Sequence, residues 1–295
     1  MAFKKFIHSN IELIVFFLLV SILAYILLLR NWEGFFTEQN GINQLDAIIY
    51  INLEARNDRK ELIMKELEKL NTDMSKVYKV SGVYMPKNGH KGCIQSHILA
   101  LNMIKLNQWN RVLILEDDAE LNMSPETMNN VITKSLSELD THYPEWNVIM
   151  LATANKVIDT DYTKLNKLNT KLNNNNNNNN NNTNMKKPLP IDLGLVFEEE
   201  KKEDIIPLKL EKLKSATTSS AYIVKKEYVN HILDLFNHCN NNMSPKNMTS
   251  EGNEHWALDQ RWSEIQGKDN WFCINKDPIK QRSIWSTIQS DVGKI

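Results

Sequence analysis

From residue 46 onward, short apolar runs alternate with helical segments, and this alternation constrains the fold more than any other feature of the sequence. The helical segments are 61–70, 92–107, 125–139 and 226–236. Runs of strand length, rich in large aliphatic residues, occur at 47–53, 77–80, 111–115, 146–151 and 217–224. Strands that are apolar on both faces belong to sheets covered by helices on both sides. The sequence therefore predicts an α/β fold with an open, mostly parallel sheet.

Residues 13–29 form an apolar run in which Ser21 is the one clearly polar residue. At about 1.5 Å per residue, a helix of this run is roughly 26 Å long and can cross a bilayer. A cleaved signal peptide is the alternative, but the run is not followed by the small-residue cleavage site of such peptides. We therefore predict a cytoplasmic tail over 1–12, a transmembrane signal anchor over 13–30 and a linker over 31–45.

The flanking charges predict the orientation of this anchor. Lys4 and Lys5 precede it, whereas Arg30 and Glu33 follow it, so the positive-inside bias favours a cytoplasmic N-terminus. The chain is then a single-pass type II membrane protein whose body lies in a lumen of the endoplasmic reticulum or Golgi type. In that compartment four sequons would be glycan acceptors, although chance is an alternative explanation in a chain so rich in asparagine. The sequons begin at Asn122, Asn181, Asn242 and Asn247.

Residues 46–290 are predicted to form one domain with a low-complexity insertion at about 155–214. Residues 173–182 are all asparagine, and charged residues follow them, so we expect this segment to be a disordered surface loop. The formal net charge of -1, from 35 Lys+Arg and 36 Asp+Glu, provides no basic surface and argues against a nucleic-acid partner. Three cysteines are too few for a disulfide framework, although one pair remains open.

Three acidic residues, Glu116, Asp117 and Asp118, directly follow the apolar run at 111–115. Open α/β sheets bind ligands beyond the carboxyl ends of their strands, and carboxylate oxygens suit Mn²⁺ or Mg²⁺ bridging a diphosphate. Alternate residues of an extended chain point the same way, so Glu116 and Asp118 are the candidate metal ligands. A solvated loop or a helix cap is the alternative interpretation of these acids.

Four blocks of sequence, in this order, resemble glycosyltransferase family 25. The blocks are AIIYINLEARNDR at 47–59, GCIQSHILAL at 92–101, VLILEDDAEL at 112–121 and SSAYIVKKEYVNHIL at 219–233. A closing segment, DPIKQRSIWSTI at 277–288, is also similar to the family. This family contains lipopolysaccharide and lipooligosaccharide glycosyltransferases and collagen hydroxylysine galactosyltransferases. The resemblance covers about 46–288 apart from the insertion.

The resemblance implies a GT-A-type nucleotide-sugar-binding fold, a UDP-sugar donor and a divalent metal. It places the acidic metal motif of the family at Glu116–Asp118, with Asp118 on the metal, Glu116 in contact with the metal or the ribose, and Asp117 behind them. A metal there would offset the negative charge that develops on the departing diphosphate. The acceptor would be a glycan or a hydroxylysine-like site on a protein, and galactose is the favoured sugar.

Further donor-binding candidates follow from the same blocks. Asn52, Arg56 and Arg59 lie just beyond the first strand, where a uridine and its phosphates are expected, and arginine can bind phosphate through two N–H groups. For either arginine, a position on the surface of the first helix is an equal alternative. Ser96 and His97 are predicted to orient the donor or to support the acidic loop. Cys93 and His97 also have zinc-compatible spacing, but no second ligand pair at comparable spacing accompanies them.

Asp259 matches the position of a family aspartate near the acceptor and is the predicted general base of an inverting transfer. Glu254 and Glu251 compete for this role, and a plain acidic residue on a helix surface is the alternative for Asp259. The second functional hypothesis is an anchored domain that keeps the fold as a binding or scaffold module without catalysis. Phosphoryl transfer and serine hydrolysis lack their motifs, since GxxxxGK[ST], GxGxxG and GxSxG do not occur.

Overall fold

The computed structural model describes residues 40–161, 187–199, 204–243 and 254–283, with a few positions before residue 26. The chain divides into two compact units, 1–39 and 40–295. In the first unit the described positions, 15, 18–22 and 25, are helical. Within the described residues no helix is both long and apolar enough to cross a membrane. Most of the predicted anchor at 13–30 lies outside the described residues, so the anchor stays a prediction.

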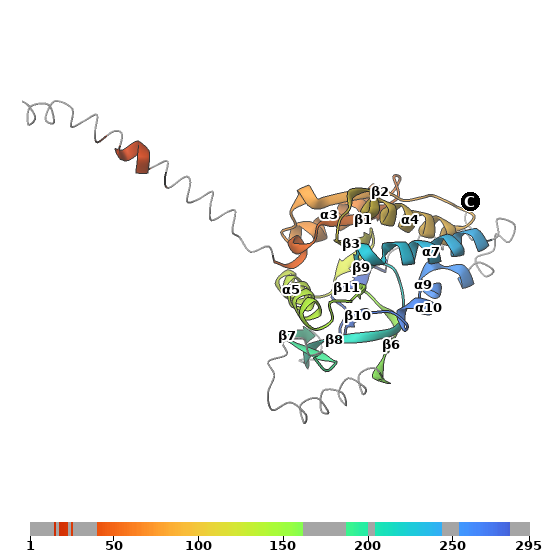
Figure 1. The fold of residues 1–295 in the computed structure, drawn as a ribbon. Helices are drawn as coiled ribbons and strands as arrows, with labels where there is room; N and C mark the ends of the chain where they lie inside the picture. The colour runs from red at the N-terminus through yellow and green to blue at the C-terminus, as the bar shows by residue number, and fades with distance from the viewer. Residues whose placement is uncertain are drawn as a thin grey trace, which may run out of the picture. The chain divides into compact units, whose positions relative to one another are not determined.

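Within the described part of the second unit, nine strands form one large sheet (Figure 1). Eight of them follow the order β2-β1-β3-β9-β5-β10-β8-β6, and β7 pairs with β8 beside this path. The strands are β1 (Ala47–Asn52), β2 (Val77–Ser81), β3 (Arg111–Glu116), β5 (Val148–Met150), β6 (Ala154–Ile158), β7 (Ile191–Glu199), β8 (Asp204–Thr217), β9 (Ala221–Lys225) and β10 (Trp271–Ile274). The predicted strands at 47–53, 77–80 and 111–115 are thus confirmed.

The sheet is mixed, with most strands pointing in one direction. β1 is parallel to both β2 and β3, and β5 is parallel to β10. β9 is antiparallel to β3 and β5, and β8 is antiparallel to β10, β6 and β7. The carboxyl ends of β2, β1 and β3 therefore meet at one edge of the sheet, where α/β folds bind their ligands.

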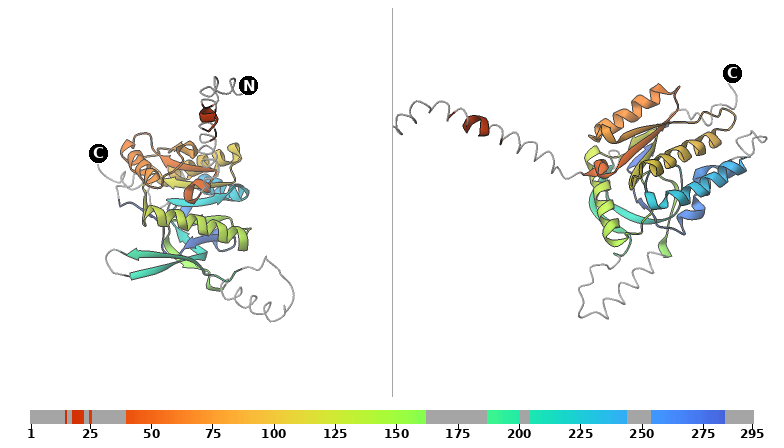
Figure 2. Two further views of the ribbon diagram at one scale, coloured as in Figure 1. Left: turned by 90° about the vertical axis from the view of Figure 1, so that its left-hand side faces the viewer. Right: turned by 45° about the horizontal axis from the view of Figure 1, so that its top comes forward.

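Helices cover both faces of the sheet, as the sequence predicted. α3 (Asn57–Lys69) and α5 (Pro125–His142) pack on one face with Ile48, Leu113 and Ile149. α4 (Gly89–Asn107) and α7 (Lys226–Asn242) pack on the other face, where they lie side by side (Figure 2). Side chains cap the starts of two helices: the Asn88 side chain accepts a hydrogen bond from the Lys91 N–H, and Ser124 caps α5 ahead of Pro125.

The structure corrects the predicted insertion at 155–214. Three strands, β6, β7 and β8, lie largely within this range, and the residues outside the described set within it are 162–186 and 200–203. β7 and β8 pair as an antiparallel hairpin, whose buried members Ile191, Leu208 and Leu210 join the core on the side of α5. Apolar and charged residues alternate around Leu208 and Leu210, so their neighbours Lys209 and Glu211 stay partly exposed, whereas Lys212, further along β8, is buried.

A second, two-stranded sheet closes the domain beside the acidic residues. β4 (Ala119–Leu121) pairs antiparallel with β11 (Ile279–Gln281). Short helical segments complete the described chain: η1 (Gly41–Gln44), η2 (Met74–Lys76), η3 (Glu254–Trp256), α9 (Leu258–Arg261) and α10 (Ser263–Gln266). The pairing of β4 with β11 brings the end of the described chain to the residues that directly follow β3.

Candidate functional site

The acidic residues lie where β3 ends at the ligand-binding edge of the sheet. Glu116 is the last residue of β3, and Asp117 and Asp118 form the turn into β4. Asp117 is 6% exposed and Asp118 is 5% exposed. Buried carboxylates require compensating partners, because burial strongly disfavours the ionised form. The partners of the three acids therefore define what this site can bind.

Asp117 is held by the end of β1 and the start of α3. The Asn52 side chain donates to Oδ2 of Asp117 at 2.8 Å, and Nη1 of Arg59 donates to Oδ1 at 2.8 Å. Burial raises the pKa of Asp117, although these two donors oppose the shift. Asn52 also donates to the Arg56 carbonyl at 3.0 Å, which fixes the chain as it leaves the strand. The result is one buried cluster of hydrogen-bonded side chains, formed by Asn52, Arg59 and Asp117.

Asp118 has fewer partners. Its Oδ2 accepts a hydrogen bond from Nε2 of Gln281 at 3.1 Å and lies 3.6 Å from Nη1 of Arg59. Its Oδ1 is buried, with no hydrogen-bond partner among the described residues. Burial, together with the neighbouring charge of Glu116, raises the pKa of Asp118 to about 7. A buried carboxylate oxygen without a donor is suited to coordinating a cation.

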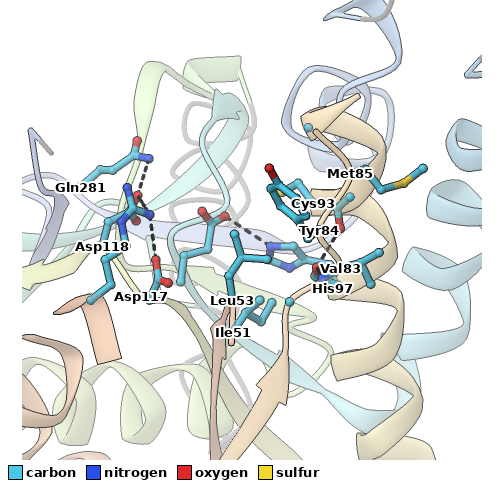
Figure 3. Close-up of a pocket in the computed structure, with 16 residues that line it drawn as sticks. Ile51, Leu53, Val83, Tyr84, Met85, Cys93, His97, Asp117, Asp118 and Gln281 are labelled. Carbon is cyan, nitrogen blue, oxygen red and sulfur yellow. Dashed lines mark hydrogen bonds and ion pairs between the residues drawn. The ribbon is translucent and has the colours of Figure 1, made fainter. Parts of the chain in front are cut away.

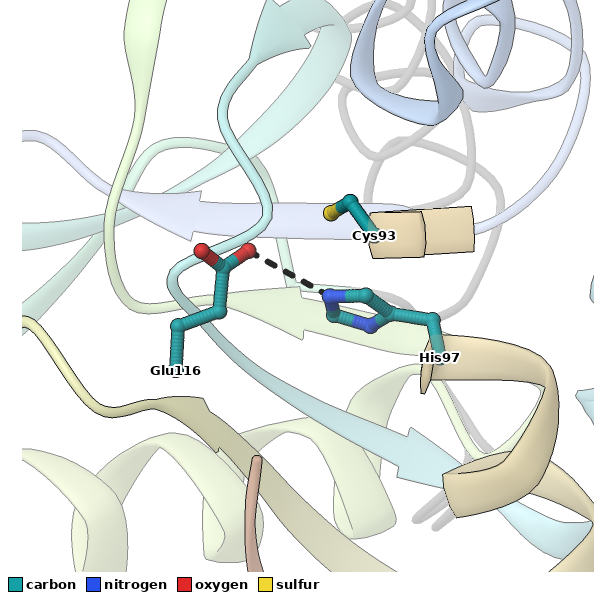
Figure 4. Close-up of side chains that lie close together, drawn as sticks. All are labelled: Cys93, His97 and Glu116. Carbon is teal, nitrogen blue, oxygen red and sulfur yellow. Dashed lines mark hydrogen bonds and ion pairs between the residues drawn. The ribbon is translucent and has the colours of Figure 1, made fainter. Parts of the chain in front are cut away.

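Glu116 has neutral and basic neighbours from α4 and from the loop between β8 and β9. Its Oε1 lies 3.3 Å from Nε2 of His97 on α4 (Figure 4). The same oxygen accepts a hydrogen bond from the Ser219 hydroxyl. The backbone N–H of Glu116 donates to the Ser220 carbonyl at 2.9 Å. Burial raises the pKa of Glu116, but the hydrogen bonds from His97 and Ser219 outweigh burial, so the net shift is downward. Glu116 is therefore ionised in its resting environment.

His97 links Glu116 to the sheet. The ring is fully buried, and its Nδ1 lies 3.0 Å from the hydroxyl of Tyr222 on β9. The two nitrogens therefore face different partners, so that the orientation of the ring is fixed. Tyr222, His97 and Glu116 form a chain of polar contacts across β9, α4 and β3.

Ser96 supports the loop between β2 and α4. Its hydroxyl donates to the Gly92 carbonyl at 2.7 Å and accepts from the Val83 N–H at 2.8 Å. Gly92 permits this close approach, because a Cβ atom there would lie 2.4 Å from the Val83 carbonyl oxygen. The loop consequently packs directly on α4 and forms one wall of a pocket.

This pocket has a volume of about 100 Å³. Asp117, Asp118 and Gln281 lie on one side of it, and Cys93, His97 and Tyr84 lie on the other (Figure 3). The structure brings six of the predicted site residues to its lining: Arg59, Ser96, His97, Glu116, Asp117 and Asp118. Asn52 is joined to this lining through Asp117.

The remaining predicted residues lie elsewhere. Arg56 pairs with Asp58 at 2.7 Å outside the pocket lining, and the Asp58 side chain is exposed to solvent. Asp259, on α9, accepts a hydrogen bond from the Thr218 N–H at 3.2 Å. It is near enough to Cys93 for its charge to raise the pKa of that thiol, behind the larger effects of burial and Glu116. The Glu254 side chain and the whole of Glu251 lie outside the described residues.

Sequence reasoning missed the loop at 218–220. Thr218 has a φ of +76°, a value that β-branched residues rarely adopt, and Asp259 holds its N–H. The next two residues, Ser219 and Ser220, both bind Glu116. Ser219 and Ser220 belong to the block at 219–233 that resembles the family, but the resemblance assigned neither residue a role in the site. Gln281 was likewise inside a matching block without an assigned role.

Comparison with curated proteins finds no match for this chain. Among solved structures it is similar to a glycosyltransferase involved in the glycosylation of the major capsid of PBCV-1, with 13% identity and a TM-score of 0.40. That match covers 83% of this chain and 96% of the other. It is also similar to A197 from STIV, with 8% identity, a TM-score of 0.34, and 82% and 87% of the two chains covered. A mannose-1-phosphate geranyltransferase from Thermus thermophilus matches with 7% identity and a TM-score of 0.33, over 82% and 75%.

The comparison with protein families gives a stronger result. The model of glycosyltransferase family 25, described as an LPS biosynthesis protein, matches residues 84–248. This range is more than half of the chain and includes α4, the acidic residues after β3 and the loop at 218–220. The chain therefore belongs to glycosyltransferase family 25 and is a glycosyltransferase.

Proposed function

We propose that the chain transfers a hexose, with galactose favoured, from a UDP-sugar to a hydroxyl of a glycan or of a hydroxylysine-like protein site. The transfer is metal-dependent and inverts the anomeric centre, on a domain of the GT-A type. The observation that carries this proposal is the buried Oδ1 of Asp118, which has no hydrogen-bond partner among the described residues. It belongs to an acidic cluster at the carboxyl end of β3, in the wall of a pocket.

The cation is Mn²⁺ or Mg²⁺, and Glu116 and Asp118 hold it. The donor set fits such a cation, since both residues offer carboxylate oxygens and hard divalent cations prefer oxygen. When bound, it supplies positive charge that offsets the charge developing on the departing UDP. Asp117 acts indirectly: it holds Arg59 and Asn52, and this group fixes the turn that carries Asp118.

The neighbouring side chains position these acids and receive the donor. His97 and Ser219 orient the Glu116 carboxylate through the contacts to its Oε1. Ser96 fixes the wall opposite through the Val83 N–H, which shapes the space for the nucleotide. Arg56 lies outside the pocket lining and is paired with Asp58, and it serves the donor phosphates by exchanging that partner for them.

Asp259 is the proposed general base. An acceptor hydroxyl must lose its proton as its oxygen attacks the anomeric carbon, and a carboxylate on the acceptor side can take that proton. The hydrogen bond from the Thr218 N–H holds the Asp259 carboxylate in one orientation. Glu254 and Glu251 remain competing candidates for this role.

The proposal includes the location of the protein in the cell. The predicted anchor at 13–30 holds the protein in the membrane as a type II membrane protein, and the catalytic domain lies in the lumen, where glycan and protein acceptors are available. Extraction tests this: the full chain should remain with the membrane fraction in high salt and enter solution in detergent. Recovery of the chain in the salt extract would contradict the anchor.

The decisive experiment measures UDP release by the full-length chain in mild detergent. UDP-galactose, UDP-glucose and UDP-N-acetylglucosamine are supplied in turn, each with Mn²⁺ and each with EDTA, alongside Asp118→Asn. Release that needs the metal, selects one donor and is lost in the variant supports the proposal. Stabilisation by a UDP-sugar without turnover would favour a binding or scaffold module. With neither turnover nor stabilisation, the nucleotide-sugar assignment is wrong.

A further inference from the structure

Three side chains with metal-binding atoms meet in the wall of the pocket. Cys93 and His97 lie one turn apart on α4, and Glu116 ends β3. The Cys93 sulfur, a ring nitrogen of His97 and a carboxylate oxygen of Glu116 all lie within 4.8 Å of one another (Figure 4). Within the described residues, no other set of three Cys, His, Asp or Glu side chains meets this distance.

These donors differ in kind from those of the Asp118 site. A thiolate, an imidazole and a carboxylate together are typical of zinc, with a fourth position left for solvent or a ligand. Zinc bonds of about 2.0–2.3 Å at tetrahedral angles place the ligand atoms roughly 3.3–3.8 Å apart. Small side-chain rotations can therefore bring these three groups to zinc geometry.

The contacts of the His97 ring match those of a typical metal-bound histidine. Metal-bound histidines commonly use their second nitrogen for a hydrogen bond that fixes the ring. Here Nδ1 lies 3.0 Å from the Tyr222 hydroxyl, while Nε2 points to Glu116. A tyrosine hydroxyl can donate or accept, so it remains a partner when the imidazole proton moves from Nε2 to Nδ1.

We propose that Cys93, His97 and Glu116 form a zinc-binding site in the pocket, which overlaps the hard-cation site assigned to Glu116 and Asp118 but differs from it in its ligands. This inference goes beyond the proposed function, since zinc binding here requires neither a UDP-sugar nor catalysis. The two sites share Glu116, so zinc occupies part of the donor site and excludes the cation that accompanies the donor.

Charge and proton balance favour the zinc complex. On binding, the Cys93 thiol loses its proton to solvent, the Glu116 carboxylate is already ionised, and His97 binds zinc through Nε2 while its ring proton moves to Nδ1, facing the Tyr222 hydroxyl. The two negative ligands neutralise Zn²⁺, so the buried complex has no net charge. Burial and the negative charges of Glu116, Asp259 and Asp118 raise the pKa of Cys93, so the thiol is protonated until a cation displaces the proton.

Cobalt substitution provides the test. Co²⁺ replaces Zn²⁺ in such sites, and bonding to a thiolate gives an intense near-ultraviolet charge-transfer band. We expect the full-length chain to develop this band with one equivalent of Co²⁺ in the absence of any sugar nucleotide. The band should disappear in Cys93→Ser and remain in the matched control Cys239→Ser, whose thiol is buried outside the three-residue cluster. A missing band in the unmodified chain, or a band that survives in Cys93→Ser, overturns the proposal.

A second measurement is made on the unmodified chain, so its result does not depend on whether Cys93→Ser folds. In the unmodified chain, Zn²⁺ should slow alkylation of Cys93 at least tenfold, read as the modified peptide by mass spectrometry. Glu116→Gln keeps the shape of the side chain but removes a charged ligand, so it should weaken zinc binding at least tenfold. Alkylation of Cys93 at an unchanged rate with Zn²⁺ present overturns the site. Neither assay requires transferase activity. A chain that binds zinc but does not transfer a sugar would therefore contradict the proposed function without contradicting the zinc site.

Discussion

When no metal is bound, the Asp118 carboxylate is buried, and burial disfavours its ionised form. Its Oδ1 has no hydrogen-bond partner among the described residues, so the charge of the carboxylate destabilises the metal-free fold. The pKa of about 7 follows from this burial and from Glu116. Because the folded state holds the proton more tightly than the unfolded chain, stability falls as the pH rises from about 4 to about 7.

Asp118→Asn should therefore separate stability from function. The amide removes the charge and keeps an acceptor for Gln281, so we expect the free energy of unfolding at pH 8 without metal to rise by about 1–3 kcal/mol. The same variant should lose stabilisation by Mn²⁺ together with UDP-sugar. Urea unfolding with and without these ligands measures both effects. Glu120→Gln, on β4 near the site, is the control; a variant Asp118→Asn that is less stable and still binds Mn²⁺ contradicts the assignment.

Asp259 has a structural contact and a proposed chemical role, and two substitutions distinguish them. Asp259→Asn preserves an acceptor for the Thr218 N–H but cannot take a proton, so kcat should fall by about 100-fold or more with stability retained. Asp259→Ala should lose the same activity and, in addition, about 1 kcal/mol of stability. Steady-state UDP release and urea unfolding measure the pair. If Asp259→Asn retains its kcat, the residue only positions the loop at 218–220, and another acid is the base.

At the scale of elements, the contact between α4 and the loop after β2 shapes the pocket. A Cβ atom at Gly92 would lie 2.4 Å from the Val83 carbonyl, a backbone atom that can move only with the loop. Alanine favours a helix by about 1 kcal/mol over glycine, but the clash opposes this gain. We expect Gly92→Ala to destabilise the protein by about 1–3 kcal/mol and to weaken donor binding.

The control for this prediction lies on the same helix. Asn102 is exposed on α4, so Asn102→Ala should leave stability unchanged or raise it by a few tenths of a kcal/mol. Thermal unfolding of both variants, with and without UDP-sugar, gives the comparison. Equal melting temperatures for Gly92→Ala and Asn102→Ala would show that the loop does not depend on close packing against α4.

At the scale of the whole molecule, the described strands on either side of residues 162–186 lie close together. Ile158 pairs with Leu213 and Ile191 pairs with Leu210, so the two flanks lie three residues apart along β8, or about 10 Å. The returning chain is also tied to α5, where Lys187 pairs with Glu138 at 3.0 Å. A short linker can therefore replace the segment without disturbing either flank.

We predict that a Gly/Ser linker of roughly twelve residues in place of 162–186 changes the free energy of unfolding by less than about 1 kcal/mol. Transferase activity should be retained. Ile191→Asp is the contrasting variant: it buries a charge in the hairpin core and should unfold the domain or cost at least about 3 kcal/mol. Urea unfolding of both variants gives the comparison. A tolerated Ile191→Asp would mean that the β7–β8 hairpin does not belong to the core.

The error at 155–214 has a physical explanation. Lys and Glu between the apolar residues of β8, and the neighbouring asparagine run, made the region resemble a low-complexity segment. Burial needs only every second residue of a strand, so Leu208 and Leu210 reach the core while their charged neighbours remain outside. The same local reasoning succeeded for β1 and β3, which are apolar on both faces and have no such ambiguity.

The sequence by itself determined the fold class and the position of the acidic residues, because both depend on local order: strands apolar on both faces and acids at the end of one of them. Tertiary structure decided which partners these acids have. Gln281 reaches Asp118 from the far end of the chain, and Tyr222 fixes His97 from a strand that enters the sheet antiparallel. Such contacts depend on strand order and on the closure of long loops, which residue spacing along the chain does not encode.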